Sequence, residues 1–490
     1  MPSLKIRLSK SKFMSGLQCH KRLWWEIHDP DAPELKVDAA QQFLFDQGHH
    51  VGRVAQTYVP DGVLIDVPYR ERERRLRETA EALKAGARVL YEAAFEHDNV
   101  LVVADILARD RKEWKLIEVK SSTKVKPEHL PDVAIQAHVL RGAGLDVRHA
   151  ELMHLNRECR YPDLSGLFER EDCTAEVEVL LEDTPKEIGA QLRALNGPLP
   201  KVATGDHCFE PYECPFIGRC WPDPPPHAIG TLYRLGAAQR DRYVRRGYRT
   251  ILDLPPDEEL TALQERQRRA VRKKGLIVES GLGAVLKQLK GPLAFLDFET
   301  VALAIPVWDG CRPYDQVPVQ LSVHRQGSKG RITHHEWLAE GPEDPRESMA
   351  RKLIEFTRGA GSVLAYNAPF EKRCIQALRE HLPRLAAQLR DIEDRLVDLL
   401  PLVRDNVYHP AFEGSFALKS VAPVLAPGLS YDDLEIAEGG EASQMLSTLL
   451  FKGDEMKNAD RARLRRSLLE YCALDTQALV KLYEALVRLA

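Results

Sequence analysis

The sequence predicts an α/β fold divided among several domains, and three observations carry this prediction. Segments typical of strands and of helices alternate over residues 291–490, which is the pattern of an α/β domain. Two further strands are predicted within residues 99–121. Pro, Gly and Cys crowd residues 198–226, a composition typical of a domain boundary. We therefore expect an α/β domain at 1–222, a helical basic linker domain at 228–290 and an α/β domain at 291–490.

Length and composition limit the class of protein. At 490 residues the chain can hold two or three units that each bury a full core. The net charge of −4 argues against a basic coat protein, although a local basic groove remains compatible with it. No run approaches the ~20 apolar residues that cross a bilayer, and residues 1–30 lack the apolar core of a signal peptide. We expect a cytoplasmic protein with no membrane partner, whose nine cysteines do not form a disulfide framework.

Hydrophobic periodicity predicts the order of elements before residue 290. These are helices near 38–58 and 71–91, strands at 99–108 and 113–121, a helix at 131–142, a strand at 149–156, and a helix, glycine turn and helix at 243–254. The basic residues at 266–274 could contact phosphates. A solvated linker helix explains that basic run equally well.

The stretch Leu293–Val301 is predicted to be a buried strand launched by Gly291-Pro292. Because side chains alternate along a strand, Asp297 and Glu299 share one face and Phe298 points to the other. Two carboxylates on an otherwise apolar strand are costly to bury unless a cation neutralises them, and Mg²⁺ or Mn²⁺ prefers such oxygen ligands. The alternative is a strand end at which both acids meet solvent.

A second pair of carboxylates is predicted on a hairpin formed by Leu101–Ala108 and Trp114–Ser121. With a turn at Arg111 and Lys112, Asp105 lies opposite Glu118, and Lys120 shares their face. Two carboxylates can hold a metal that activates water, and a lysine can stabilise charge that develops in the transition state. A solvated surface hairpin is the alternative, and a slip of one residue in the register would break the arrangement.

Four cysteines are candidates for a metal centre. Cys208, Cys214 and Cys220 follow one another at intervals of five intervening residues, and Cys19 lies far upstream. Structural zinc usually takes cysteine pairs two to four residues apart, whereas Cys₄ ligation of an iron–sulphur cluster tolerates wider spacing. Zinc in place of the cluster remains open. The other five cysteines are interpreted as small core residues.

Two later segments could complete the acidic site of the strand at 293–301. Asn367 is a plausible helix N-cap with Pro369 in the first turn, and this helix start could aim Glu371 at the strand acids. Tyr471 and Asp475 are four residues apart on one face of the last predicted helix. An ordinary helix start and an ordinary surface contact are the alternatives.

The hairpin resembles the restriction-endonuclease-like (PD-(D/E)XK) nucleases, and specifically their RecB-like branch. The residues that carry this resemblance are Asp105, Glu118, Lys120 and Gln136. The sequence departs from the branch upstream, where the branch often has Gly-x-x-x-His but Gly48 is followed by His49, His50 and Gly52. The resemblance implies that these four residues are catalytic, with Asp105 and Glu118 as ligands of Mg²⁺ or Mn²⁺.

The order of the cysteines, one before this nuclease core and three after it, resembles the iron–sulphur RecB-like nucleases, which include CRISPR-associated exonucleases. It implies that one [4Fe–4S] cluster is held by Cys19, Cys208, Cys214 and Cys220.

The acidic motifs of the last 200 residues resemble the DEDDy 3′–5′ exonucleases, which have a ribonuclease H-like fold. The resemblance implies that Asp297, Glu299, Glu371 and Asp475 bind two divalent metals and that Tyr471 orients the attacking water. Glu371 departs from the usual aspartate. Asp398 is a spare candidate, interpreted as a residue at a helix start.

The whole chain resembles an uncharacterised bacterial family in which both nuclease-like domains are fused. The resemblance implies a metal-dependent nuclease that hydrolyses single-stranded or end-containing DNA rather than RNA. It also implies a role in DNA repair, processing or defence. The alternative is a nucleic-acid-binding scaffold with one or both sites inactive. Protein partners are not predicted.

Overall fold

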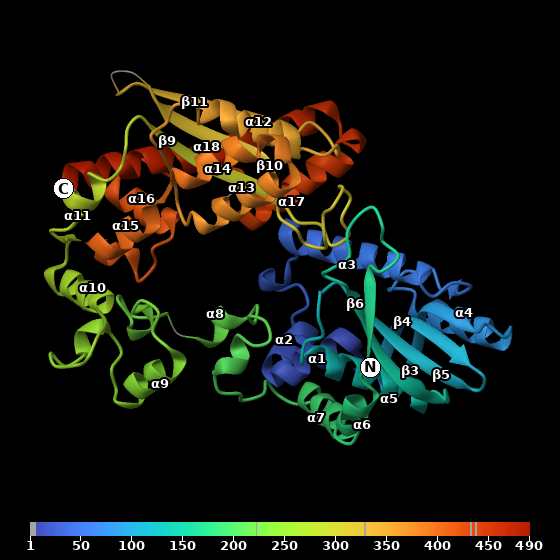
Figure 1. Cartoon of the computed structure of the whole chain (residues 1–490). Coiled ribbons are helices and arrows are strands. Elements are labelled where there is room, and N and C mark those ends of the chain that lie inside the picture. The colour runs from blue at the N-terminus through green and yellow to red at the C-terminus, as the bar shows by residue number, and fades with distance from the viewer. Residues whose placement is uncertain (1–5, 222, 328–329, 432–433, 437–438) are drawn as a thin grey trace. The chain divides into compact units, whose positions relative to one another are not determined.

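The protein is a mixed α/β molecule made of two compact units (Figure 1). The computed structural model describes residues 6–221, 223–327, 330–431, 434–436 and 439–490. Unit 1 comprises Met1–Pro222 and Leu303–Asp315, and unit 2 comprises Asp223–Ala302 and Gln316–Ala490. The segment 228–290, which the sequence predicts as a separate domain, is therefore grouped with unit 2.

Unit 1 is built on a seven-stranded sheet in its described part. The strands follow the order β2 (Val63–Leu64), β3 (Val89–His97), β4 (Val100–Asp110), β5 (Glu113–Lys120), β6 (Val147–Leu155) and β7 (Phe168–Asp172), and β1 (Leu8–Ser9) pairs in parallel with β4. The helices are α1 (Lys10–Gln18), α2 (His20–His28), α3 (Ala39–Thr57), α4 (Arg72–Lys84), α5 (His129–Gly142), α6 (Thr174–Leu181), α7 (Thr184–Leu195) and α8 (Ile217–Cys220).

Alternation along β4 and β5 gives the sheet of unit 1 two buried faces. Leu107 and Leu116 pack into the core formed with α5, whereas Ile106 and Ile117 pack with Ala55 of α3. Asp105 and Glu118 have the same parity as Leu107 and Leu116, so their strand positions face α5.

The predicted charged helix at 71–91 is wrong in its second half. Helix α4 ends at Lys84, Gly86 takes a φ of +88°, and Val89 already begins β3. Glycine adopts this left-handed conformation without steric cost, so it ends the helix and lets the chain turn into the sheet.

Unit 2 contains a mixed five-stranded sheet in its described part, ordered β11 (Ile332–Leu338), β10 (Val317–Gln326), β9 (Leu293–Val301), β12 (Ser362–Ala365) and β13 (Leu396–Asp398). Strand β10 runs antiparallel to β9 and β11, while β9, β12 and β13 run parallel. A small antiparallel pair joins β8 (Ile277–Val278) to β14 (Val407–Tyr408). The helices are α9 (Ala237–Arg245), α10 (Ala262–Lys273), α11 (Leu282–Leu286), α12 (Arg346–Phe356), α13 (Pro369–His381), α14 (Ala386–Asp394), α15 (Leu399–Asn406), α16 (Leu418–Leu425), α17 (Gly439–Lys452) and α18 (Asn458–Leu489).

The strand predicted at Leu293–Val301 is confirmed as β9, with the same bounds. Its residues alternate between two cores: Phe298 packs in the core with α12 and α13, whereas Phe295 packs in the core with Leu479 of α18. Asp297 and Glu299 continue the face of Phe295, so the helix α18 lies over the strand acids (Figure 1).

The basic run at 266–274 is partly structural. Arg266 is buried, and it donates to Glu279 Oε1 at 2.8 Å and to the Arg404 carbonyl at 2.7 Å. Arg268 is also buried and donates to the Pro255 carbonyl at 2.8 Å. These two guanidinium groups hold loops together and are not free to track phosphates. The second helix predicted within 243–254 is only the short 3-10 turn Ile251–Asp253.

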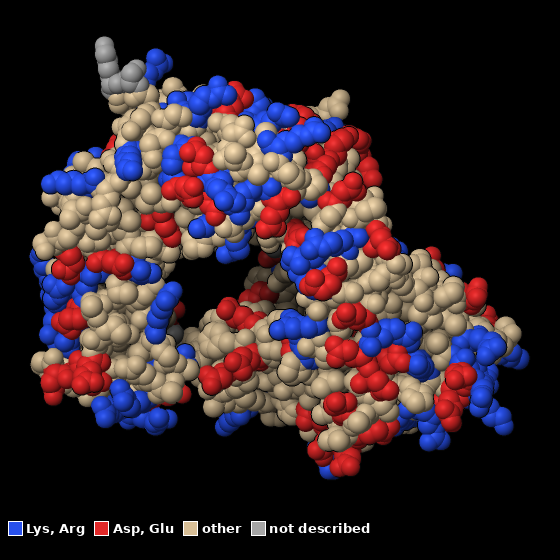
Figure 2. All heavy atoms as spheres, in the orientation of Figure 1, with Lys and Arg blue, Asp and Glu red and all other residues tan. Residues whose placement is uncertain are grey.

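On the face that Figure 2 shows, basic and acidic side chains are interspersed over both units. Among the described residues, no helix combines the length and the hydrophobicity that crossing a membrane requires.

Candidate functional site

The hairpin acids of unit 1 meet where the regular strand pairing stops. The β4–β5 ladder has the predicted register, with Ile106 paired to Ile117. One step further, the side chain of Asp105 takes the place of a ladder partner, because its Oδ2 accepts from the Val119 amide at 2.7 Å. The β3–β4 pairing also skips this level, at Glu92, which has a φ of +56°. The acids therefore lie at a local break in the sheet.

The four residues predicted from the hairpin and helix are brought together here, in what we call the first acidic centre: Asp105, Glu118, Lys120 and Gln136. Lys120 Nζ lies 2.8 Å from Glu118 Oε1, and Gln136 Nε2 donates to Glu118 Oε2 at 2.7 Å. Helix α5 supplies Gln136 from a fully buried position. Glu118 thus accepts from a charged donor at Oε1 and from a neutral donor at Oε2.

Two residues of this centre were missed from the sequence. Lys10 Nζ lies 2.7 Å from Glu118 Oε1 and 3.3 Å from Asp132 Oδ1, and Lys120 also pairs with Asp132. Asp132 could have been found, because it precedes Gln136 by four residues on one helix face. Lys10 carries no local signal, since α1 brings it from 108 residues away in the chain.

Burial and charge divide the acids of the first acidic centre. Burial acts to raise the pKa of Glu118, but Lys10 and Lys120 outweigh it and hold that pKa below its usual range. Burial and the charge of Glu118 raise the pKa of Asp105 well above its ordinary value. The pKa of Glu92 is also raised, chiefly by burial. A cation beside Asp105 would relieve this cost, so the donor set fits a hard divalent metal.

His49 and His50 both lie exposed on α3. The proximity of His49 lowers the pKa of Glu92, against the larger effect of burial. Burial and the charge of Arg53 lower the pKa of His50.

In unit 2, three predicted carboxylates form a second acidic centre: Asp297 and Glu299 from β9 and Asp475 from α18. One oxygen from each lies within 4.8 Å of the other two. Asp297 and Asp475 also line a cavity of about 260 Å³ whose wall includes Lys419 and Tyr366. Oxygen ligands this close together suit Mg²⁺ or Mn²⁺.

Two tyrosines and a lysine surround Asp475. Tyr431 donates its hydroxyl to Asp475 Oδ1 at 2.8 Å. Lys419 Nζ donates to the predicted Tyr471 hydroxyl at 3.1 Å and lies over both rings, 4.9 Å from the centre of Tyr471 and 5.2 Å from that of Tyr431. Tyr431 was missed, because it comes from an irregular segment with no motif around it.

Glu371 is buried in the first turn of α13, and its Oε2 has no hydrogen-bond partner among the described residues. Burial raises its pKa to about 7. The predicted N-cap is wrong by one residue: Ala368 precedes the helix, while Asn367 takes a φ of +63° and its amide donates to Asp398 Oδ1 at 2.9 Å. Asp398 itself caps α15, as expected for a structural residue. Glu371 lies outside the cluster of three carboxylates. Its negative charge still repels that of Asp297, and this repulsion raises the pKa of Asp297.

Like charges are crowded at the second acidic centre. Burial, Asp475 and Glu299 raise the pKa of Asp297 well above its ordinary value. Burial and Asp475 raise the pKa of Glu299 to about 8. The cluster is costly to ionise without a cation, and a divalent metal would neutralise it.

We expect the stability of EDTA-treated protein to fall as pH rises from about 4.5 to about 8. The pKa of Glu299 is 4.5 in the unfolded chain and about 8 in the folded protein, so between these pH values only the folded state holds the proton. The free energy of unfolding therefore falls by up to ~1.4 kcal/mol per pH unit within that window. Urea unfolding at several pH values measures this slope. Glu299→Gln should flatten it, and an unchanged slope in that variant would contradict the assignment.

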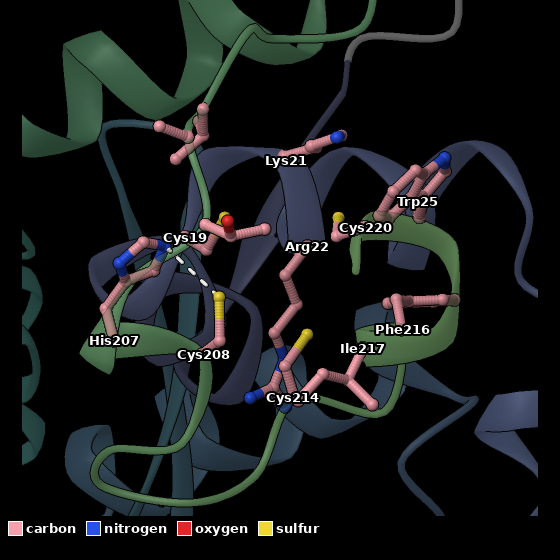
Figure 3. A pocket seen from close by; sticks show the side chains of 13 residues that line it. Cys19, Lys21, Arg22, Trp25, His207, Cys208, Cys214, Phe216, Ile217 and Cys220 are labelled. Carbon is pink, nitrogen blue, oxygen red and sulfur yellow. Dashed lines mark hydrogen bonds between the residues drawn. The ribbon is translucent and has the colours of Figure 1, made fainter. Parts of the chain in front are cut away.

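The four predicted cysteines line one pocket of unit 1, which we call the cysteine pocket (Figure 3). Cys19 joins α1 to α2, and the other three come from the segment 208–220. Gln18 fastens that segment to α1, since its Nε2 donates to the carbonyls of His207 at 2.8 Å and Tyr212 at 2.7 Å. Two distant parts of the chain are thereby clasped together.

The cysteine pocket also holds positive charge. Lys21 and Arg22 lie in its wall. Burial raises the pKa of Cys214, Arg22 lowers it, and the neighbouring Cys19 and Cys208 raise it. No three of the four sulfurs lie mutually within 4.8 Å, a spacing wider than the ~3.8 Å that ligands of one tetrahedral Zn²⁺ require. His207 Nε2 lies 3.7 Å from Cys208 Sγ (Figure 3).

Comparison with protein families found a similarity that covers about a quarter of the chain. A family model described as "Domain of unknown function (DUF2779)" matches residues 294–417, a range that contains Asp297, Glu299 and Glu371. A solved structure described as "Crystal structure of SSO0001" is similar over 44% of this chain and 85% of its own, with 14% identity and a TM-score of 0.20. A likeness at that TM-score carries no argument.

The chain is also similar to a protein of Mycoplasma pneumoniae (strain ATCC 29342 / M129 / Subtype 1) described as "Uncharacterized protein MG366 homolog". The two are 24% identical over an alignment of 230 residues, and the alignment covers 42% of this chain. The match spans 34% of the length of that relative, about a third.

Proposed function

We propose that the protein is a metal-dependent nuclease with two catalytic centres. The observation that carries this proposal is the second acidic centre, where one oxygen each of Asp297, Glu299 and Asp475 lies within 4.8 Å of the other two, beside a cavity that Asp297 and Asp475 line. Mg²⁺ or Mn²⁺ bound there would activate water and stabilise the leaving oxygen of a phosphodiester. The mixed sheet, with both strand acids facing the last helix, supports a ribonuclease H-like assignment for this domain.

Three side chains near the second acidic centre can assist this hydrolysis. Tyr471 is held by Lys419, so its hydroxyl can orient the attacking water beside Asp475. The ammonium of Lys419 adds positive charge where a phosphate would enter the cavity. Glu371 has an unpartnered buried oxygen and can contribute a further ligand.

We propose that the first acidic centre is a PD-(D/E)XK nuclease site. Asp105 and Glu118 would hold the metal, and Gln136 orients Glu118. Burial lowers the pKa of Lys120, but Glu118 and Asp132 outweigh it and raise that pKa. Lys120 is therefore protonated at neutral pH, and it stabilises developing negative charge rather than acting as a general base.

We further propose that the cysteine pocket holds a [4Fe–4S] cluster. A cubane keeps its four cysteine sulfurs farther apart than a single zinc ion does, which agrees with the open spacing of the four thiols. Lys21 and Arg22 offset the negative charge of a thiolate-bound cluster.

The substrate we propose is single-stranded or end-containing DNA rather than RNA, which rests on the resemblance of the hairpin to RecB-like nucleases. A specific observation favours a second candidate, a nucleic-acid-binding scaffold. Lys10 and Lys120 already neutralise Glu118 and Asp132, so these two carboxylates are charge-balanced without a metal.

The experiment is hydrolysis of end-labelled DNA with Mg²⁺ or Mn²⁺ by full-length protein purified anaerobically. Lys120→Ala and Asp297→Ala should each remove a separable part of the activity. The matched controls are Lys115→Ala, on the same strand and paired with Glu151, and Asp391→Ala, on the surface of α14. DNA binding without hydrolysis would favour the scaffold, and full activity in the double variant would overturn the nuclease proposal.

A further inference from the structure

Two histidines and an aspartate meet at the end of the sheet of unit 1, outside both acidic centres and the cysteine pocket. His97 is the last residue of β3, Asp98 lies in the turn to β4, and His138 lies on α5. Asp98 Oδ2 lies 3.0 Å from His138 Nε2 and 3.4 Å from His97 Nε2. One ligand atom from each residue lies within 4.8 Å of the other two.

The two separations at Asp98 match those between ligand atoms of a single bound ion. In a tetrahedral zinc site, bonds of about 2.0–2.1 Å place neighbouring ligand atoms ~3.3 Å apart. The two separations at Asp98 are 3.0 and 3.4 Å, on either side of that value. An ion could therefore enter with small side-chain movements.

The backbone around the three residues is arranged to bring them together. Asp98 and Asn99 both take a positive φ, +50° and +61°, which makes the tight turn that returns the chain into β4. On α5, a Cβ at residue 142 would lie 2.0 Å from the His97 ring, so Gly142 lets that ring lie in its present position against the helix. His138 is held in the fold, with its side chain 15% exposed, and Asp98 at 47% stays open to an entering ion.

We propose that His97, Asp98 and His138 bind one Zn²⁺ ion. Two imidazoles and one carboxylate are the ligand types of zinc, whereas Mg²⁺ prefers oxygen alone. Three protein ligands leave a fourth coordination position for water or a small ligand. The ion ties the β3–β4 turn to α5, the helix that carries Asp132 and Gln136 of the first acidic centre. This site does not depend on the proposed nuclease activity.

The test is titration of chelator-treated full-length protein with Co²⁺, used as a spectroscopic probe for zinc. With excess Mg²⁺ present to occupy the two acidic centres, we expect one equivalent of Co²⁺ with visible bands typical of nitrogen and oxygen ligands and without the charge-transfer bands of thiolates. That equivalent should persist in Cys214→Ala, which separates it from metal bound at the cysteine pocket, and in His149→Ala, an exposed histidine on β6.

His138→Ala and Asp98→Asn should each weaken binding by more than the ~10–100-fold that loss of an outer-shell partner costs. Asp98→Asn preserves the shape of an exposed turn residue, so it guards against a folding defect in His138→Ala. Zn²⁺ should also raise the melting temperature of the wild-type protein and not that of Asp98→Asn. Unchanged Co²⁺ affinity in both variants, or no nitrogen- and oxygen-bound equivalent at micromolar Co²⁺, would overturn the proposal.

Discussion

Asp475→Asn is expected to lower the metal-dependent hydrolysis of the second acidic centre on the order of 10²-fold or more, and to stabilise the metal-free protein. Asn keeps the volume of Asp and can still accept the hydrogen bond from Tyr431. It removes one of three crowded charges, and Asp475 is the first charge, after burial, that raises the pKa of Asp297 and of Glu299. The same change therefore weakens the metal site and relieves repulsion in its absence.

Three measurements check this result. Hydrolysis of end-labelled DNA is followed in a Lys120→Ala background, which isolates the second acidic centre, and thermal unfolding is followed in EDTA. Mn²⁺ affinity by calorimetry should fall together with the activity. Loss of activity with unchanged Mn²⁺ affinity would contradict the role of Asp475 as a ligand.

Asp398→Ala is the structural control, because it should show the opposite pattern. Asp398 Oδ1 accepts from the amides of Leu400 and Asn367, both at 2.9 Å, so it caps α15 and fixes the turn before α13. We expect a loss of stability of about 1 kcal/mol, typical of a damaged cap, with nuclease activity retained. Activity lost in Asp398→Ala but kept in Asp475→Asn would exchange their assigned roles.

Local periodicity explains what the sequence could predict. The two-residue period of a strand places Asp297 and Glu299 on one face, and the hairpin register places Asp105 beside Glu118, because both arguments need only neighbouring residues. These predictions depend on backbone geometry that the chain fixes locally. Gln136 and the ligand role of Asp475 were predicted from the resemblance to known nucleases, and helix periodicity adds only that Tyr471 and Asp475 share one face.

Contacts between distant segments explain what was missed. Lys10 reaches Glu118 from another part of the chain, and Tyr431 reaches Asp475 from a segment without regular structure. Helix and strand patterns carry no information on such pairings. Strand β3, with Glu92, was hidden by the charged segment before it, and only the turn at Gly86 separates the two.

The missed Lys10 links two features that the sequence treats separately. Helix α1 begins at Lys10, which pairs with Glu118, and ends next to Cys19 of the cysteine pocket. Nine helical residues span ~13 Å as a stiff rod. Gln191 holds the middle of that rod, since its Nε2 donates to the Phe13 carbonyl at 3.0 Å. A ligand that fixes the cysteine pocket would therefore also fix the position of Lys10 in the first acidic centre.

That linkage gives Cys214→Ala a large expected effect: loss of the brown colour and of the absorbance near ~400 nm expected of an iron–sulphur protein, with a lower melting temperature. Cys214 is buried and lies among Cys19, Cys208 and Arg22. Without the cluster, the segment 208–220 is held to the N-terminal region by the hydrogen bonds of Gln18, the ion pairs of Arg219 and the packing of Phe216 on Trp25. A loss of about 2 kcal/mol corresponds to a drop of at least ~4 °C for a unit of this size.

Cys374→Ala is the matched control, because Cys374 is equally buried but packs in the hydrophobic core of unit 2. It should keep the colour and the iron content of the wild type. Iron and acid-labile sulphide are measured after anaerobic purification, together with zinc. A colourless protein with one zinc per chain would reject the cluster, and full colour in Cys214→Ala would remove Cys214 from its ligands. Because α1 begins at Lys10 and ends next to Cys19, loss of the cluster should also reduce the Lys120-dependent part of DNA hydrolysis and spare the Asp297-dependent part. A general folding defect would not produce that difference.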